Sequence, residues 1–122
     1  MIKVLVVDDN ATLREALAEA LDDRGMEVVG QAMDGDEACR AAMELEPDVV
    51  VMDIRMPGMS GPRATTWLAG HCPGVRVVGL TAYEDEALHK AMTGAGAAEV
   101  LVKGASIKTI VSAIAEAGSV RG

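Results

Sequence analysis

Long apolar segments are missing from this sequence. No apolar run approaches the length of a membrane span. The first residues, MIKVLVVDD, reach acidic side chains too early for a signal peptide. These absences argue against a membrane protein and against export, so we expect a cytoplasmic protein that makes no contact with a membrane.

Basic residues and cysteines are also scarce. The chain has 11 lysine and arginine residues against 19 aspartate and glutamate residues, which gives a net charge of -8. An acidic surface repels phosphate backbones, so we expect no direct nucleic acid binding by this segment. Cys39 and Cys72 lie far apart in the sequence, without the spacing of a metal or redox pair, and we assign them no function.

The chain does contain a regular alternation of strand and helix patterns. Its 122 residues suffice for one domain, and we expect residues 1–122 to form a single unit. Short apolar runs alternate with stretches of helical periodicity, which is typical of a parallel sheet covered by helices on both faces. The runs predict five strands, at residues 3–7, 26–30, 48–52, 75–80 and 99–102.

Five helices are predicted between and after these strands. The first follows a cap at Asn10 and carries Leu13, Leu17 and Leu21 on one face. The others are predicted at residues 35–46, around Trp67, at residues 84–94 and after a cap at Ser106. The helix at 84–94 has the thinnest apolar face, so we expect it to be weakly held.

Five polar residues lie at or just past the carboxyl ends of predicted strands: Asp8, Asp9, Asp53, Thr81 and Lys103. In open α/β sheets, ligands bind in the crevice at that edge. Each residue alone has an ordinary explanation as a helix cap or a solvated charge. Their occurrence together at one edge indicates a shared site.

The three carboxylates in this group predict a metal site. If they converge to about 5 Å, each pair repels by roughly 3 kcal/mol at an effective dielectric constant of about 20. Lys103 compensates one of the three negative charges, and one divalent cation would neutralise the other two. Oxygen ligands and waters suit Mg²⁺, so we expect Asp8, Asp9 and Asp53 to bind Mg²⁺.

The same group has the parts for phosphoryl transfer, because it combines a carboxylate, a metal, an ammonium and a hydroxyl. Asp53 is the best candidate for the nucleophile, since it stands alone at its strand end whereas Asp8 and Asp9 come as a pair. Lys103 would pair with a phosphate group, and Thr81 would donate a hydrogen bond to it.

Several motifs, taken together in this order, resemble the receiver domains of two-component response regulators. The matching segments are VLVVDDN (4–10), DVVVMDIRMPGMSG (48–61), LTAYEDE (80–86) and AMTGAGAAEVLVKGAS (91–106). The resemblance covers essentially the whole chain. It implies a doubly wound, flavodoxin-like α/β fold, in which five helices flank a five-stranded parallel sheet of order 2-1-3-4-5.

The resemblance also implies a role for each site residue. Asp53 corresponds to the aspartate that takes a phosphoryl group from a phosphohistidine of a sensor histidine kinase. Thr81 corresponds to the hydroxyl that moves toward the phosphoryl group, and Lys103 to the lysine that pairs with it. Such a domain is a phosphoacceptor rather than an enzyme, because it catalyses only its own phosphorylation and dephosphorylation.

For the metal, the resemblance implies a more detailed ligand set. Asp8 and Asp9 correspond to the acidic pair of the family, in which the second residue binds Mg²⁺ directly and the first binds it largely through water. A further ligand is the backbone carbonyl at the position of Arg55, two residues after Asp53.

Three positions depart from or vary within the family pattern. The chain has Val100 where such domains commonly carry an aromatic residue, and it contains no phenylalanine, so a rotating ring there cannot report phosphorylation. Gly104 follows Lys103 where many members have proline, and we expect a trans peptide because a non-proline cis bond costs about 3 kcal/mol. Tyr83 is expected to shape access to the site.

The end of the chain resembles the NarL/FixJ-type branch, whose receivers usually lead into a helix-turn-helix DNA-binding domain. The sequence stops at Gly122, so we expect the receiver part of a longer transcription factor that binds DNA through a missing C-terminal domain. The alternative is a receiver that stands alone. The expected partner is the sensor histidine kinase, and a homodimer is a further possibility that the sequence leaves undecided.

Other functions fit the sequence less well. Phosphatases of the haloacid dehalogenase type need a second aspartate two residues after the nucleophile, and that position is Arg55. The segment GAGAAE (94–99) lacks the final glycine of a dinucleotide-binding loop and precedes a strand. The strongest rival is a receiver-like platform that is never phosphorylated. Such modules usually lack one of the five site residues, and all five are present here.

Overall fold

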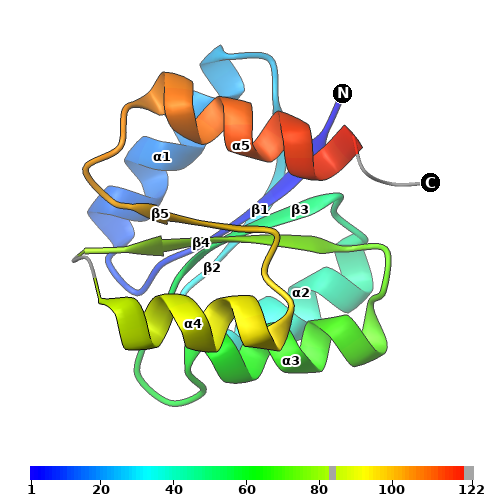
Figure 1. Cartoon of the computed structure of the whole chain (residues 1–122). Coiled ribbons are helices and arrows are strands. Elements are labelled where there is room, and N and C mark those ends of the chain that lie inside the picture. Colours follow the sequence, from blue (N-terminus) through cyan, green and yellow to red (C-terminus); the bar gives the residue numbers. More distant parts are fainter. Residues whose placement is uncertain (83–84, 120–122) are drawn as a thin grey trace.

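The computed structural model describes residues 1–82 and 85–119, and it shows a central sheet between two layers of helices (Figure 1). The strands are β1 (Lys3–Val7), β2 (Glu27–Ala32), β3 (Val49–Asp53), β4 (Arg76–Thr81) and β5 (Glu99–Val102). All of them pair in parallel, in the order β2-β1-β3-β4-β5. The predicted sheet and strand order are therefore confirmed.

Two apolar clusters fill the space between the sheet and the helices. The helices are α1 (Ala11–Asp23), α2 (Gly35–Leu45), α3 (Gly61–His71), α4 (Glu86–Ala95) and α5 (Ile107–Ser119). One cluster joins the sheet to α1 and α5, and the other joins it to α2, α3 and α4 (Figure 1). The predicted doubly wound α/β class is thus confirmed.

Side-chain caps set where several helices begin. Asn10 and Ser106 each accept a hydrogen bond from the backbone N–H three residues later, so both predicted caps are confirmed. The fourth helix begins at Glu86, because Asp85 caps it by accepting a hydrogen bond from the Leu88 N–H. The predicted start of this helix at position 84 falls outside the described residues.

Burial is greatest in the middle of the sheet. Every residue of β3 and all but the first of β1 are buried. The edge strands β2 and β5 keep exposed positions, because each has a neighbouring strand on one side only. The expected cover on both faces is therefore confirmed, because even the edge strands pack into both clusters, through Ala32 and Val28 of β2 and Val100 and Leu101 of β5.

One residue expected on the inner face of the first helix points outward. Leu21 is fully buried and Leu17 is half-buried, but Leu13 is 50% exposed. Leu13 lies in the first turn of α1, which starts just beyond the carboxyl end of β1. That turn extends past the edge of the sheet, so the strands do not cover it.

The helices differ in how much they bury. Four residues of α2 are buried, whereas in α4, every residue of which is described, Met92 alone is buried. Met92 fits against the sheet because Gly79 of β4 has no side chain, and a Cβ there would lie 2.8 Å from Met92 Cε. This agrees with the weak hold predicted for the fourth helix.

Two further observations concern the described part of the chain. It contains no cis peptide bond, so the Lys103–Gly104 bond is trans as predicted.

None of the helices in the described part of the chain is both long and apolar enough to cross a membrane.

Candidate functional site

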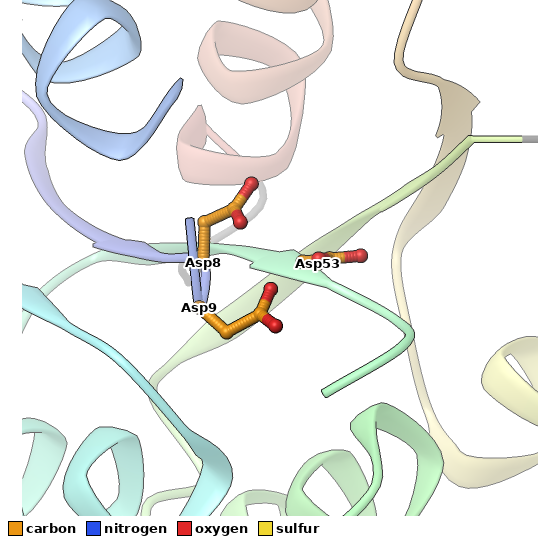
Figure 2. Close-up of side chains that lie close together, drawn as sticks. All are labelled: Asp8, Asp9 and Asp53. Atoms are coloured by element: carbon orange, nitrogen blue, oxygen red, sulfur yellow. The ribbon is translucent and has the colours of Figure 1, made fainter. Parts of the chain in front are cut away.

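The acidic residues predicted at the strand ends meet at one edge of the sheet. Asp8 and Asp9 follow β1, and Asp53 is the last residue of β3 (Figure 2). One carboxylate oxygen from each of the three residues lies within 4.8 Å of the other two. Asp8 and Asp53 are buried, whereas Asp9 is exposed. The convergence assumed from the sequence is therefore present.

Strand pairing explains this convergence. Val7 of β1 lies opposite Met52 of β3 in the parallel register, so the residues that follow them, Asp8 and Asp53, end side by side. Val7 and Met52 are themselves buried. The apolar stem of each strand thus fixes the position of the acid at its end.

Lys103 binds both buried carboxylates. Its Nζ lies 3.0 Å from Asp8 Oδ2 and 3.2 Å from Asp53 Oδ2. Its backbone N–H donates to the carbonyl of Thr81 at 2.6 Å, which ties the end of β5 to the end of β4. The lysine therefore reaches the site from a neighbouring part of the sheet and lies between the two acids.

Burial and pairing act in opposite directions on these charges. Burial raises the pKa of Asp53, and the hydrogen bond and charge of Lys103 offset part of that rise. Burial alone would lower the pKa of Lys103, but its hydrogen bonds to Asp8 and Asp53 raise it above its usual value. Lys103 is therefore a firmly charged partner in a site that still has an excess of negative charge.

Arg14 supports the acidic turn, although no pattern in the sequence singles it out. Its Nη1 donates to the Asp8 carbonyl at 2.8 Å, and its Nε donates to Gln31 Oε1 at 3.1 Å. Asp8 Oδ1 also accepts from the Asn10 N–H at 2.9 Å. An arginine in the helix after an acidic pair is a weak signal, because a solvated side chain would give the same pattern.

Arg55 contacts the site through its backbone and a helix cap through its side chain. Its N–H donates to Asp53 Oδ1 at 3.2 Å, and its Nη2 lies 3.0 Å from Asp85 Oδ2. The pKa of Asp85 is lowered by the hydrogen bond from the Leu88 N–H and by the charge of Arg55. Asp85 was also missed in the sequence, since nothing local links it to a residue of the loop after β3.

Thr81 occupies the end of β4 and is buried. An open cavity of about 460 Å³ lies beside it, lined also by Asp85, His89 and Val100. Val100 is buried at the position where the family commonly has an aromatic ring. The role suggested for Tyr83 falls outside the described residues.

The two cysteines do not join the site. Both are free thiols, as predicted, and Cys39 is buried against the sulfur of Met59. Burial raises the pKa of Cys39 to about 11, with the nearby charge of Asp36 adding to the effect. Burial also raises the pKa of Cys72. Both thiols are therefore protonated and weakly nucleophilic at neutral pH.

The donors at the strand ends fit a hard divalent cation. Among the described residues, the one group of acidic, histidine or cysteine side chains close enough to hold a metal is Asp8, Asp9 and Asp53. All three offer carboxylate oxygens, which hard cations such as Mg²⁺ prefer to nitrogen or sulfur. Lys103 pairs with two of these carboxylates, Asp8 and Asp53, so the three acids together leave negative charge for such a cation to neutralise.

Comparison with known proteins gives consistent results. Residues 4–115 match the response regulator receiver domain family. Response regulator GacA of Pseudomonas syringae pv. syringae (strain B728a) is 44% identical over 115 residues, which cover 93% of this chain and 54% of GacA. Transcriptional regulatory protein LnrK of Bacillus subtilis (strain 168) is 42% identical over 115 residues, which cover 93% of this chain and 52% of LnrK.

A solved structure agrees with these sequence matches. The signal receiver domain of NarL from Mycobacterium tuberculosis superposes with a TM-score of 0.93 at 32% identity, covering 98% of each chain. This chain spans about half the length of the curated relatives it matches. The family match, the relatives of NarL/FixJ type and the shared fold agree, and the chain belongs to the receiver domains of two-component response regulators.

Proposed function

We propose that this domain accepts a phosphoryl group on Asp53 from a phosphohistidine of a sensor histidine kinase. The observation that carries the proposal is the position of Asp53 at the end of a buried strand, 3.2 Å from Lys103 and close to Asp8 and Asp9. This arrangement combines a nucleophile, a cation and a set of metal ligands at the edge of the sheet where ligands bind.

In the proposed reaction, an oxygen of the Asp53 carboxylate attacks the phosphorus atom of the phosphohistidine. The phosphorus–nitrogen bond breaks, and its electron pair stays on the imidazole of the kinase, which then takes up a proton. The Arg55 N–H and the Lys103 ammonium hold the two oxygens of Asp53 and so orient the carboxylate before attack. Lys103 then pairs with the phosphoryl group, and the Thr81 hydroxyl moves toward it.

The metal expected here is Mg²⁺, held by Asp8, Asp9, Asp53 and the backbone carbonyl of Arg55. When bound, it supplies positive charge that offsets the repulsion between the carboxylates and the phosphoryl oxygens. In this scheme the domain catalyses only its own phosphorylation and dephosphorylation. It therefore acts as a phosphoacceptor and not as an enzyme on other substrates.

Phosphorylation would act on an output outside this chain. We propose that Thr81 and the weakly packed α4 move inward and change the face formed by α4, β5 and α5. Residues 1–122 would then be the receiver domain of a longer cytoplasmic transcription factor, which contacts DNA through a C-terminal helix-turn-helix domain and can form a homodimer. The greater length of the relatives and the name of LnrK support this reading.

The test is the intact mass of the protein after incubation with acetyl phosphate, with and without Mg²⁺. We expect a Mg²⁺-dependent gain of one phosphoryl group that Asp53→Asn lacks. Asp36→Asn is the matched control, because Asp36 is an exposed carboxylate on α2, and it should keep the gain. If the folded wild type gains nothing under any condition, the chain is a platform that works without phosphorylation.

A further inference from the structure

Arg55 connects the phosphoacceptor to the start of α4. Its N–H donates to Asp53 Oδ1 at 3.2 Å, while its Nη2 lies 3.0 Å from Asp85 Oδ2. The other oxygen of Asp85 accepts from the Leu88 N–H at 3.1 Å and caps α4. One carboxylate therefore holds both the first turn of α4 and a side chain from the loop that carries the site.

This link can matter because α4 buries few side chains, although it packs against α3 and β5 and its Leu88 lies against the core cluster. Met92 is the one buried residue of this fully described helix, and the side chains of its first turn contribute no buried residue. The Arg55 side chain is 60% exposed and that of Asp85 is 30% exposed. An ion pair with this much exposure is weak and easily exchanged for another partner.

Arg55 also borders an open space that reaches one residue of the site. An open cavity of about 710 Å³ is lined by Arg55 and Asp85 and also by Asp9, one of the three clustered acids. The exposed side chain of Arg55 and this open space leave room for the arginine to turn from Asp85 toward the end of β3.

We propose that the Arg55–Asp85 ion pair is a latch on α4, and that a phosphoryl group on Asp53 opens it by drawing the Arg55 guanidinium away from Asp85. This inference rests on the proposed phosphorylation of Asp53. A phosphoryl group carries about 1.5 to 2 negative charges, in place of the single charge of the carboxylate, and it adds three acceptor oxygens, which guanidinium groups bind in pairs. Asp85 keeps its hydrogen bond to Leu88, so α4 stays capped while its start is freed.

In this scheme Asp85 is a positioning residue, because it acts on the site through Arg55. Asp85→Asn tests this role, since asparagine caps helices as well as aspartate but lacks the charge that holds Arg55. Arg55→Gln removes the guanidinium and keeps the backbone. Glu86→Gln is the matched control, because it removes a carboxylate that lies in the same turn of α4 but pairs with Lys90 instead of Arg55. The Nζ of Lys90 lies 3.7 Å from Glu86 Oε1.

The experiment measures two quantities for each variant. The first is amide hydrogen exchange of residues 86–95 without ligand. The second is the affinity for beryllofluoride, a phosphoryl mimic, in the presence of Mg²⁺. Asp85→Asn should speed exchange in α4 toward the rate of the beryllofluoride-bound wild type and should bind the mimic about two- to fivefold more tightly, as the loss of one exposed ion pair implies.

Arg55→Gln separates the latch from a simple loss of charge. It should speed exchange in α4 in the same way but gain no affinity for the mimic, because the guanidinium that would bind the phosphoryl group is gone. The double variant should match Arg55→Gln, and Glu86→Gln should match the wild type.

Several results would overturn the latch. One is unchanged exchange of α4 in Asp85→Asn, and another is a gain of affinity from Asp85→Asn that persists in the Arg55→Gln background. In either case, if the wild type still binds beryllofluoride, the latch alone is wrong. If the wild type binds no beryllofluoride, the proposed phosphorylation of Asp53 fails, and the latch fails with it.

Discussion

The two halves of the site are held by the fold with unequal strength. Asp8 directly follows β1 and Asp53 ends β3, two of the three buried strands in the middle of the sheet. Lys103 follows the edge strand β5, half of which is exposed. Thr81 is itself buried at the end of β4, but it lies beside α4, where Met92 is the one buried residue. Local stability follows buried contacts, so the carboxylates are fixed in the rigid half and conformational change is left to the other.

The same substitution at two glycines gives the largest expected contrast between these halves. A Cβ on Gly61 would lie 2.8 Å from Ile54 Cα and 2.9 Å from its carbonyl oxygen, and this backbone cannot easily move. A Cβ on Gly79 would lie 2.8 Å from Met92 Cε, the end of a flexible side chain. In urea unfolding, we expect Gly61→Ala to cost about 3 kcal/mol and Gly79→Ala about 1 kcal/mol.

One result for Gly61→Ala and Gly79→Ala would contradict this expectation. If both alanines lower the free energy of unfolding equally, then α4 is packed as rigidly as the loop after β3. The contrast between the two halves would then be wrong.

Removing the ammonium of Lys103, which joins the two halves of the site, should have the next largest effect on the free energy of unfolding. Lys103→Met leaves Asp8 and Asp53 close together without a cation, and because Lys103 is partly exposed we expect a loss of about 2 kcal/mol at pH 7 in EDTA. Lys108→Met, at an exposed lysine of α5, is the control and should change the free energy of unfolding little.

The loss should depend on pH in a defined direction. Burial raises the pKa of Asp53, and Lys103 partly lowers it, so the variant should raise this pKa further. A carboxyl with a raised pKa in the folded state stabilises the fold fully below its unfolded pKa, and this stabilisation is lost as pH rises through the folded pKa. The deficit of Lys103→Met should therefore shrink as pH falls from 7 toward 4, and a deficit that grows would contradict the geometry.

Magnesium should stabilise the rigid half. At ten times its dissociation constant, a ligand that binds only the folded state adds about 1.4 kcal/mol. We expect a rise of this size in the free energy of unfolding of the wild type, measured against a sodium salt of equal ionic strength. Asp9→Asn should reduce the rise at little structural cost, because Asp9 is exposed. An equal rise in Asp9→Asn would place the ion elsewhere.

The smallest expected effect is at Leu88 of α4, which is half-buried. Leu88→Ala should lower the global free energy of unfolding by only about 0.5 kcal/mol, but it should speed amide exchange throughout residues 86–95. Leu68→Ala, at a fully buried position of α3, should instead cost about 3 kcal/mol. Similar losses at both positions would remove the distinction between α3 and α4.

Local patterns in the sequence predicted most of the fold. Continuous apolar runs predicted the strands, and Asn10 and Ser106 predicted two helix starts, because these signals act within a few residues. The outward position of Leu13 was missed, since it depends on where the sheet ends.

The site was predicted to a similar extent. Asp8 and Asp53 could be placed together, because parallel strands bring their carboxyl ends to one edge. The contacts of Arg14 and the Arg55–Asp85 ion pair could not be predicted. Both join segments that are distant in sequence through long side chains, whose direction no periodic pattern encodes.

The stacking of Trp67 affects how this protein can be observed in solution. Trp67 is the single tryptophan of the chain, and its ring stacks on His71 with ring centroids 4.0 Å apart. It also lines a cavity with Cys39 and Met43 of α2, on the side of α3 that faces α2. Its fluorescence therefore reports the packing of α2 against α3, and an optical assay of switching would need a probe introduced on α4 instead.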